Sequence, residues 1–306
     1  MCSRGVASIA AGRLHTCALM AASQGLRCRG SNANDQLVDD TVGCRLTPPA
    51  SDLMSGVRAV APGQHHACAL MSGGGLRCWG ENRYGQLGDG TPTDRSTPPD
   101  TDVLKNAQAM SLGRAFTCVL TMAGGVRCWG DNSDGQLGDG STTARLAPSA
   151  GDVLSGVAAV AAGYSHTCAL MKTGGVRCWG LNENGQLGDG THVAATRPPT
   201  RDVLTDVEAI AVAYDSTCAL TRTGGVRCWG DNPYGKLGDG TTSNRAAPPT
   251  KDVLAGVRAI SAGGAQVRAL TVTDGVRCWG DNFRVQIGDG TAGWRTIPWP
   301  VPGTCH

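Results

Sequence analysis

The sequence has few aromatic residues, little net charge and no long apolar run. It contains two Phe and four Tyr in 306 residues, and its formal net charge is only +2. The basic residues are scattered along the chain rather than gathered in a stripe, so we expect no nucleic-acid partner. No stretch reaches eighteen apolar residues, so we expect no membrane-spanning helix. The first residues, Met1-Cys2-Ser3-Arg4, lack a charged segment followed by an apolar run, so we expect no signal peptide in this chain.

Sequence signatures of enzymes are also missing. The chain has no phosphate-binding P-loop, no Gly-x-Ser-x-Gly nucleophile elbow and no metalloprotease helix. Neither CxxC nor HxxxH spacing occurs, so we expect no structural zinc. The segment 131–135 resembles the start of a calcium loop, but the glutamate of the twelfth position is absent, and we interpret the segment as a turn. We therefore expect no enzymatic activity, no cofactor and no metal.

Glycine and proline are abundant, and the chain is visibly repetitive. Its 45 Gly and 15 Pro indicate many turns, while 41% hydrophobic residues are enough to bury a core. Each copy of the repeat has four short apolar runs bounded by Gly, Asn and Pro, which predict strands rather than helices. We therefore expect one domain, residues 1–306, of six repeats. The markers of the repeat recur every 50 residues and are Arg29-Gly30, Trp79-Gly80, Trp129-Gly130, Trp179-Gly180, Trp229-Gly230 and Trp279-Gly280.

The central hairpin of each repeat can be placed residue by residue. In the third copy a three-residue loop ends in Gly124 after Thr121, which predicts a type I turn followed by a bulge. This register places Cys118 opposite Cys128, with Trp129 on the other face of the sheet. Both faces of each sheet are then apolar. Such a sheet has to be covered on both sides, as it is by the neighbouring blades of a propeller.

These features predict an all-β fold, a closed β-propeller of six four-stranded blades. The chain begins at the strand 5–9 that elsewhere follows the Pro-Pro segment, and it ends with the segment 298–301 that the first blade lacks. We expect this last strand to complete the first blade. Strands from both termini would then be mixed in one blade, which closes the ring and removes exposed edges. We also expect a monomer.

One stretch of the repeat resembles the pattern of a known family. Residues 168–190 read Cys-Ala-Leu-x-x-x-Gly-Gly-Val-Arg-Cys-Trp-Gly-x-Asn-x-x-Gly-Gln-Leu-Gly-Asp-Gly, and related residues recur over essentially the whole chain. This pattern resembles the repeat of the regulator of chromosome condensation family. The resemblance implies a β-propeller, usually with seven blades, whereas the six copies here favour six. The kelch repeat has a similar length but a different arrangement of glycine and aromatic residues, and is the weaker alternative.

The resemblance implies several functions. Members of the family exchange nucleotide on a small GTPase, bind chromatin, sense ultraviolet light through clustered tryptophans, or inhibit β-lactamases. Exchange uses an extra hairpin inserted in one repeat, and the repeats here are uniform, so we do not expect guanine nucleotide exchange. Five of the seven Trp stand in the repeated Trp-Gly position, which leaves Trp294 and Trp299 and argues against light sensing. A bacterial secreted propeller that grips a protein with its loops is the closest in character.

Eleven of the fourteen Cys belong to the repeat, and the register places two of them opposite each other in five copies. We expect disulfides there, the alternative being small buried thiols such as Cys278, which faces Arg268. Cys2 and Cys305 fall at neighbouring positions of the repeat and are candidates to join the termini. Disulfides indicate an oxidising compartment, so we expect a secreted or periplasmic location. The candidate pairs within repeats are Cys17–Cys28, Cys68–Cys78, Cys118–Cys128, Cys168–Cys178 and Cys218–Cys228.

Comparison among the repeats separates framework positions from variable ones. One Asn recurs in every copy and is expected to bond the backbone of its own loop, while a recurring Asp and Arg are expected to pair between blades. Two stretches vary, namely the connection after the first strand and the dipeptide of the Asn-x-x-Gly loop. In an up-and-down blade both lie at the same end and line one rim. The candidate partner-binding residues on this rim are Arg83, Tyr84, Arg114, Phe116, Tyr164, Tyr214, Tyr234, Phe283 and Arg284.

We therefore expect a non-enzymatic propeller whose variable rim binds a protein partner. A carbohydrate-binding propeller and a structural repeat segment of a larger surface protein are the alternatives. Glycan binding that is lost on changing Tyr84 or Tyr234 to Ala would favour the first alternative. If no rim substitution affected any pull-down from native extracts, the second alternative would be favoured, since loops also vary simply because they are exposed.

Overall fold

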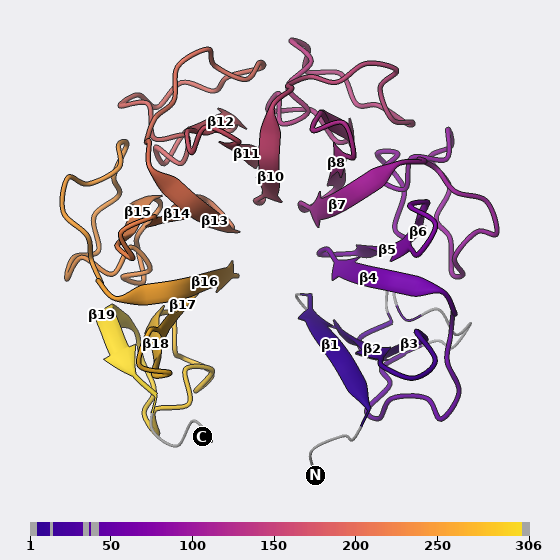
Figure 1. Ribbon diagram of the computed structural model, residues 1–306, viewed down its shortest axis with the longest axis horizontal. Coiled ribbons are helices and arrows are strands. Elements are labelled where there is room, and N and C mark those ends of the chain that lie inside the picture. Colours follow the sequence, from indigo (N-terminus) through magenta and orange to yellow (C-terminus); the bar gives the residue numbers. More distant parts are fainter. Residues whose placement is uncertain (1–4, 13–14, 33–36, 38–42, 302–306) are drawn as a thin grey trace. The chain divides into compact units, whose positions relative to one another are not determined.

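The computed structural model describes residues 5–12, 15–32, 37 and 43–301. Within these ranges every regular element is a β-strand and no helix occurs (Figure 1). The short apolar runs between Gly, Asn and Pro are strands, as their length predicts. No helix long and apolar enough to cross a membrane is present in the described part of the chain.

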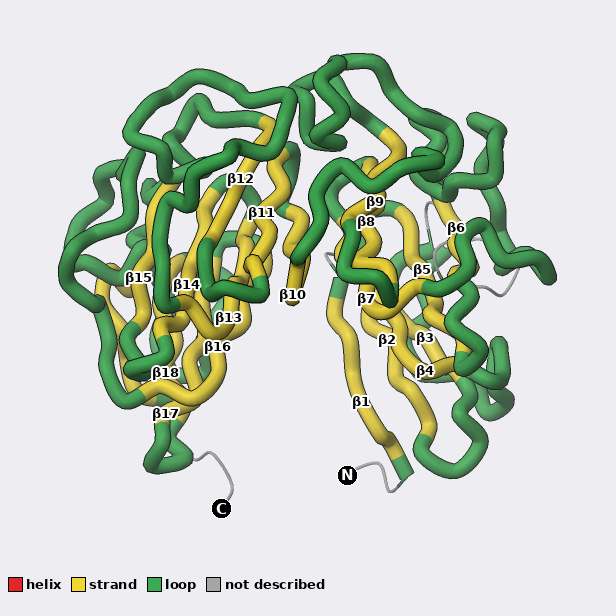
Figure 2. Tube along the Cα trace, turned by 45° about the horizontal axis from the view of Figure 1, so that its top comes forward, coloured by secondary structure: helices red, strands yellow, loops and turns green. Residues whose placement is uncertain are grey.

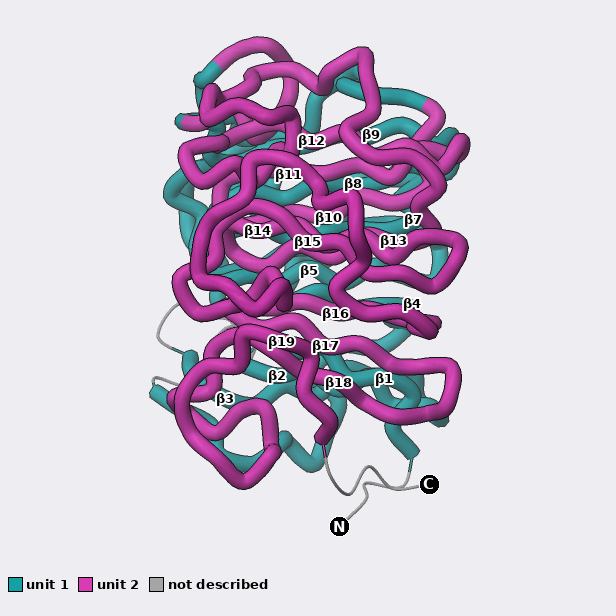
Figure 3. Tube along the Cα trace, turned by 90° about the vertical axis from the view of Figure 1, so that its left-hand side faces the viewer, with its two compact units in different colours: residues 1–133, 142–155 teal, residues 134–141, 156–306 magenta. Residues whose placement is uncertain are grey.

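The chain divides into two compact units (Figure 3). Unit 1 comprises residues 1–133 and 142–155, and unit 2 comprises residues 134–141 and 156–306. The strands of unit 1 are β1 (Val6–Ala11), β2 (His15–Met20), β3 (Leu26–Gly30), β4 (Val57–Pro62), β5 (His66–Met71), β6 (Leu76–Gly80), β7 (Ala107–Leu112), β8 (Phe116–Thr121) and β9 (Val126–Gly130). The strands of unit 2 are β10 (Val157–Ala162), β11 (His166–Met171), β12 (Val176–Gly180), β13 (Val207–Ala213), β14 (Ser216–Thr221), β15 (Val226–Gly230), β16 (Val257–Gly263), β17 (Gln266–Thr271), β18 (Val276–Gly280) and β19 (Arg295–Pro300).

Each repeat forms one antiparallel sheet, in which the second strand lies between the first and the third (Figure 2). The predicted register is confirmed, because Cys118 lies opposite Cys128 between β8 and β9. The hairpin that joins these strands closes on Gly124, whose N–H donates to the Thr121 carbonyl oxygen at 2.9 Å. Gly124 has φ of +81°, a left-handed conformation that glycine adopts at little cost.

The fourth strand predicted for each blade is not formed in five of the six described sheets. The segment that follows the third strand instead makes two isolated bridges to it, as Arg145 does with Gly130 and Leu154 with Val126. Pro148 lies between these two bridges. Proline has no backbone N–H to donate to a ladder, but the equivalent Pro298 lies within β19 of the sixth sheet, so proline alone does not explain the interruption.

The prediction that the last strand completes the first blade is wrong. β19 pairs with β18 of its own repeat, with Arg295 opposite Gly280. The first sheet already has the corresponding segment, because Arg45 bridges Gly30 of β3. Each third strand therefore pairs with the segment that follows it in the chain, and this local connection places β19 in the sixth sheet.

Neighbouring sheets of one unit pack face to face through buried apolar side chains. In unit 1, Trp129 and Val119 of the third sheet form one cluster with Leu70, Leu76 and Leu87 of the second repeat. Unit 2 contains equivalent clusters around its own tryptophans. Both faces of a sheet are thus buried, as the alternation of apolar residues predicts.

Five disulfides join second and third strands within the described residues, and they are the five predicted pairs. Their Cα atoms are 4.1–4.2 Å apart, the close spacing of a non-hydrogen-bonded pair. Cys278 is buried and free opposite Arg268, and Cys44 is exposed and free. The predicted pair Cys2 and Cys305 lies outside the described residues. The five bonds are consistent with an extracellular or otherwise oxidising location.

Candidate functional site

In the second to sixth repeats, two loops meet at the same end of the sheet, as the strand order predicts. The Asp131 N–H donates to the Ala115 carbonyl at 2.9 Å, and the Asp231 N–H donates to the Asp215 carbonyl at 2.9 Å. We call these paired loops the rim of each unit. The unit-1 rim consists of residues 15, 31–32, 64–66, 81–86, 114–116 and 131–133, and the unit-2 rim consists of residues 134–136, 164–166, 181–186, 214–216, 231–236, 264–266 and 281–286.

The recurring Asn holds the longer rim loop in shape. Asn82 Oδ1 accepts a hydrogen bond from the Leu87 N–H at 2.9 Å, and Asn82 Nδ2 donates to the carbonyls of Thr91 and Thr93. Asn182 and Asn232 make the same bonds in their own repeats. The predicted role of this residue, bonding the backbone of its own loop, is confirmed.

The recurring Asp and Arg pair within one repeat, which corrects the prediction of a pair between blades. Arg95 pairs with Asp89, and Arg245 pairs with Asp239. The reason is the loop itself, which turns back so that residues six apart come into contact. Burial opposes ionisation of Asp89, but hydrogen bonds from Arg95 and Thr91 hold its pKa below the usual value.

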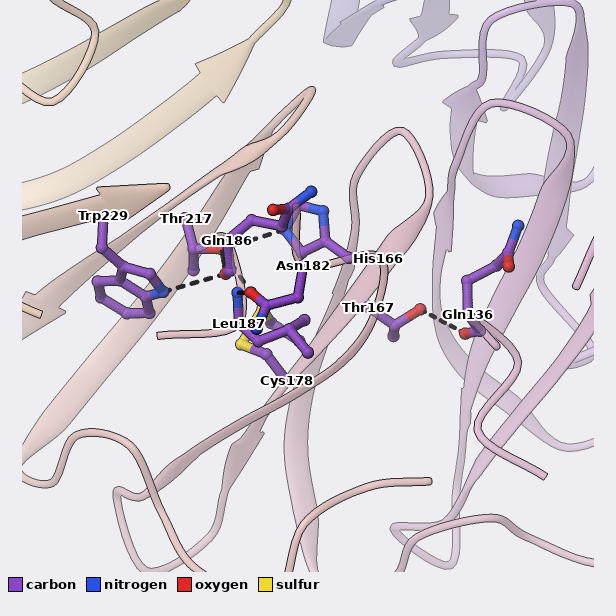
Figure 4. The surroundings of a disulfide bond; sticks show 10 residues. Gln136, His166, Thr167, Cys178, Asn182, Gln186, Leu187, Thr217 and Trp229 are labelled. Carbon is purple, nitrogen blue, oxygen red and sulfur yellow. Dashed lines mark hydrogen bonds between the residues drawn. A yellow bond between two sulfur atoms is a disulfide. The ribbon is translucent and has the colours of Figure 1, made fainter. Parts of the chain in front are cut away.

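A backbone carbonyl forms the joint between consecutive sheets of one unit. In unit 2 the Gln186 carbonyl accepts hydrogen bonds from Trp229 Nε1 at 3.1 Å and from the Thr217 hydroxyl at 3.0 Å (Figure 4). In unit 1 the Gln86 carbonyl likewise accepts from Trp129 Nε1 and the Thr117 hydroxyl. The Trp of the repeat is therefore both a core residue and a donor to the preceding repeat. This joint was not predicted from the sequence, although Gln, Thr and Trp recur in register and were a signal for it.

Two buried histidines each form a hydrogen bond with the threonine of a joint. Because the Thr217 hydroxyl donates its proton to the Gln186 carbonyl, His166 Nε2–H donates to Thr217 Oγ1 at 3.1 Å. His66 bonds Thr117 in the same way at 2.9 Å. No described residue bonds Nδ1 of His66 or His166. Burial lowers the pKa of both histidines to about 3, so both rings are neutral at physiological pH.

His15 stands at the equivalent place in the first repeat but has no hydroxyl to bond. The second repeat has Ala67 where the third has Thr117, and neither ring nitrogen of His15 has a hydrogen-bond partner among the described residues. Burial and the nearby His65 lower the pKa of His15 to about 4. The unit-1 rim therefore contains a buried, neutral and unsatisfied imidazole.

The candidate residues of the unit-1 rim differ in exposure. Arg83 and Arg114 are exposed, and the Arg83 guanidinium lies 4.8 Å from the centre of the half-buried Tyr84 ring. Phe116, however, is fully buried, so its side chain is not available to a partner and it leaves the candidate set. The cause is Gly113, where a Cβ atom would lie only 2.0 Å from the Phe116 ring. This glycine leaves room for the ring to fold inward.

The candidate residues of the unit-2 rim form two aromatic groups. Tyr164 and Tyr214 are half-buried and meet edge to face, with ring centres 6.0 Å apart. Tyr234 and Phe283 meet edge to face at 6.3 Å, and the structure adds Trp294, which lies 5.4 Å from Phe283. Arg284 is exposed beside Phe283. Sequence reasoning missed Trp294 because it lies outside the two variable stretches.

One position of the unit-2 rim carries a buried charge. Lys236 stands where other repeats have Gln, and its ammonium group donates to the Asp231 carboxylate at 2.6 Å. Asp215 lies nearby, and its Oδ1 has no hydrogen-bond partner among the described residues. Burial raises the pKa of Asp215, with Asp231, Asp134 and Glu183 adding to the rise and Lys236 opposing it.

The described residues offer no group of three His, Cys, Asp or Glu side chains that could hold a metal ion. Each rim presents aromatic and charged side chains on a framework that the hydrogen bonds of the joints hold together. Such an arrangement is suited to recognising a surface.

Repeated antiparallel sheets, packed face to face with a tryptophan at each joint, define the β-propeller class of all-β protein. The RCC1-like domain family matches residues 1–305, and the chain belongs to this family. The resemblance carried by the repeat pattern is thereby confirmed. A search of the curated proteins finds no match.

This chain covers most of the length of several solved structures that have the same fold. Yeast RCC1 (Prp20), in a structure with Kap60, has a TM-score of 0.81 and 22% identity, over 98% of this chain and 75% of that chain. Human WBSCR16 has a TM-score of 0.82 and 24% identity, over 99% of this chain and 83% of that chain. Saccharomyces cerevisiae Prp20p, described with its binding to Gsp1p and histones, has a TM-score of 0.80 and 23% identity, over 97% and 77%. At these identities the likeness shows the fold alone.

Proposed function

We propose that this chain is a non-enzymatic, protein-binding β-propeller whose partner is held by the rim loops. The observation that carries the proposal is the convergence of both variable loops at one end of the second to sixth sheets, where backbone hydrogen bonds join them. The framework residues that position these loops are repeated, while the residues at their tips change from repeat to repeat. A constant scaffold with variable tips is the usual arrangement of a binding surface.

The chemistry of the tips supports a protein partner. Tyr, Trp, Phe and Arg are over-represented at the centres of protein interfaces, and the rims expose five residues of these types, Arg83, Arg114, Tyr234, Phe283 and Arg284. The yeast relative has been described in complex with Kap60 and with binding to Gsp1p and histones, which makes protein binding a reasonable use of the fold. We do not propose nucleotide exchange, because the described repeats share one loop pattern and carry no inserted hairpin.

Site-specific photocrosslinking tests the proposal. A photoreactive phenylalanine analogue is placed at Tyr84 or Tyr234 on the rims, and at Met122 or Val272 on hairpin turns of the opposite end. Met122 and Val272 are the matched control, because they are apolar and more than half exposed. We expect specific protein adducts from the rim positions only. Adducts from all four positions, or from the hairpin positions alone, would contradict the proposal.

A glycan array distinguishes the carbohydrate-binding alternative. A glycan signal that disappears in the Tyr234→Ala variant, together with no protein adduct, would replace the protein-binding proposal. Persistence of every interaction after substitution of all exposed rim residues would instead favour a structural repeat segment.

We propose that the protein works in a secreted or periplasmic location. The five disulfides support this, because reducing compartments do not maintain such bonds. Counting free thiols in the denatured protein, purified without reductant from its natural source, tests it. Fourteen free thiols, the full number of Cys, would place the chain in a reducing compartment.

Closure into a single six-bladed domain stays a prediction. It is supported by six copies of the repeat, each with its own sheet in the described residues. Electron microscopy of the isolated protein would count the blades, and light scattering would test the expected monomer. Seven blades, or an assembly in which two chains share one ring, would overturn the prediction.

A further inference from the structure

Three exposed aromatic rings form a continuous row on unit 2. Tyr234, Phe283 and Trp294 are 39%, 56% and 47% exposed. Phe283 lies between the other two rings, with ring centres 6.3 Å from Tyr234 and 5.4 Å from Trp294. We call these three residues the aromatic row. Exposed aromatic side chains that contact one another mark an interaction surface more clearly than rings scattered singly.

The repeat shows that this row replaces a polar contact. Asn184 and Tyr234 occupy the same place in successive repeats, and so do Asn244 and Trp294. In the preceding pair of repeats, Asn244 Nδ2 donates to Asn184 Oδ1 at 3.0 Å. Two amides satisfy each other in water, whereas two aromatic rings at the same places leave apolar surface exposed. The framework therefore does not need the rings, which points to a function outside the fold.

The unit-2 rim, which carries Tyr234 and Phe283, has an excess of negative charge. The unit-2 rim holds five carboxylates against two cations, and one of the cations, Lys236, is buried and bonded to Asp231. The unit-1 rim, over its described residues, holds two of each sign. The carboxylates of the unit-2 rim are Asp134, Glu183, Asp215, Asp231 and Asp281.

Three of these carboxylates act on a fourth. Burial is the main cause of the raised pKa of Asp215, and the negative charges of Asp231, Asp134 and Glu183 add to the rise. Asp281 lies directly beside the row, because its carboxylate accepts a hydrogen bond from the Phe283 N–H at 2.9 Å. A cation that approaches this part of the rim therefore meets both carboxylates and aromatic rings.

We propose that the aromatic row and the carboxylates of the unit-2 rim bind a basic segment of a protein partner. Lysine or arginine side chains of the segment lie against the faces of the exposed rings, where the ring quadrupole attracts a cation. The carboxylates steer the segment toward the row and exclude acidic partners. This inference rests on the proposed function of the rim and specifies the chemistry of its partner.

The geometry favours a basic peptide over a neutral glycan. Phe283 is nearly perpendicular to both neighbours, at 88° to Tyr234 and 75° to Trp294, so the three rings do not form one flat platform for stacked sugars. A neutral glycan also gains nothing from the excess of carboxylates. Side chains of lysine and arginine, which have long apolar stems and a charged end, match both the crevices between such rings and the surrounding charge.

Fluorescence anisotropy with two labelled peptides tests the inference on the full chain. One peptide alternates lysine and glycine, and the other has glutamate in place of lysine. We expect measurable binding of the lysine peptide alone, weakened as salt is raised. In Phe283→Ala its affinity should fall about tenfold. The control Val272→Ala, 64% exposed on a hairpin turn of the same unit, should leave it unchanged.

Arg284, the exposed cation next to Phe283, gives a test that does not depend on removing a ring. Arg284→Glu should strengthen binding of the lysine peptide about threefold, and Glu183→Arg should weaken it by a similar factor. Both side chains are exposed, so neither change should affect folding. Equal binding of the two peptides, or weaker binding in Arg284→Glu, would overturn the inference.

Two different experimental outcomes distinguish an error in the basic-peptide inference from an error in the proposed protein-binding function. If rim crosslinking captures a specific protein but the lysine peptide binds no better than the glutamate peptide, the rim binds proteins and the basic chemistry is wrong. If the lysine peptide binds the row but the native protein crosslinks only from the hairpin turns, the proposed function is wrong.

Discussion

The two units share one framework but have different rims. Both use a glutamine carbonyl to receive a tryptophan and a threonine from the next sheet, and both staple their hairpins with disulfides. The unit-1 rim buries the rings of His15, His66 and Phe116. The unit-2 rim buries His166 but exposes the rings of Tyr234 and Phe283, two members of the aromatic row. The difference lies in the residues at the tips and leaves the joints intact.

A pair of residues in each first loop explains how one framework tolerates these differences. Where a large ring points inward, a glycine stands three residues before it, and a Cβ atom at Gly163 would lie 2.5 Å from the His166 ring. Where the ring is replaced by Ser216, the glycine is replaced by Ala213. The residues at these two positions therefore change together, a smaller one at one position accompanying a larger one at the other, and the backbone of the loop is unchanged.

The largest expected difference between the units is their response to acid. Unit 1 buries two neutral histidines, His15 and His66, while unit 2 buries His166. Their folded pKa values, about 4 for His15 and about 3 for the others, lie below the unfolded value of 6.5. The unfolded state therefore binds more protons, and stability present above pH 6.5 is lost as pH falls toward 3 or 4. Each histidine contributes about 1.4 kcal/mol per pH unit, so between pH 6.5 and 4 unit 1 should lose on the order of 7 kcal/mol and unit 2 about half of that.

Hydrogen exchange measured against pH checks this prediction. The free energy of opening is followed at the amides of β5 in unit 1 and β11 in unit 2. Phenylalanine stands naturally at position 116, so His66→Phe and His166→Phe are matched variants that keep a buried ring. Each should remove one histidine's share of the pH dependence from its own unit. Equal slopes in both units of the unchanged protein would show that the difference between the rims has no energetic consequence.

The disulfides should produce the next largest effect. Replacing Cys168 and Cys178 together by Ala opens a loop of ten residues, which should cost about 3 kcal/mol on the chain-entropy model. The sixth sheet offers the reverse experiment, because Cys278 already faces Arg268. Arg268→Cys should form a sixth bond and stabilise the sheet by a similar amount. Urea unfolding with and without reductant measures both, and a stabilisation that persists under reducing conditions would assign the gain to side-chain replacement.

Sequence reasoning predicted the repeated framework because each of its features is local. The hairpin register followed from the position of Gly124, and the register then placed Cys118 opposite Cys128. The sequence resemblance to the family was likewise carried by residues repeated at fixed spacing. Local spacing is sufficient here because adjacent antiparallel strands leave few alternative pairings.

Features that depend on contacts between repeats were predicted less well. The position of β19 was wrong because its pairing partner was inferred from the chain ends, whereas the third strand pairs with the segment that follows it. The burial of Phe116 was missed because it depends on space left by Gly113. The aromatic row was only partly found, since Trp294 reaches Phe283 from a separate loop. Such contacts are set by packing in three dimensions, which spacing along one repeat does not reveal.

A glycine at the joint tests whether the framework is the same in all repeats, with an expected effect on stability of intermediate size. Gly188 and Gly288 occupy the same place and both have φ of +77°. A Cβ atom at Gly188 would lie 2.6 Å from Trp229 Nε1, whereas at Gly288 the nearest atom, of Val301, is 3.9 Å away. Alanine at either position strains the backbone, but only Gly188→Ala displaces the tryptophan from the carbonyl. We expect Gly188→Ala to cost about 2 kcal/mol more than Gly288→Ala in urea unfolding. Equal costs would mean that the tryptophan joint is not tight.

The smallest expected effect concerns the ion pairs at the outer segments. Arg127 pairs with Asp152 in unit 1, and Arg177 pairs with Asp202 in unit 2, both at 2.7 Å and both partly exposed. Partly exposed pairs contribute little, so Asp152→Asn and Asp202→Asn should each cost about 0.5 kcal/mol, and less at high salt. Because these pairs lie in the shared framework, their costs in thermal unfolding should be equal. Unequal costs would show that the shared framework itself differs between the two units. The contrast between the buried rings of the unit-1 rim and the exposed rings of the unit-2 rim would then no longer be confined to the loop tips.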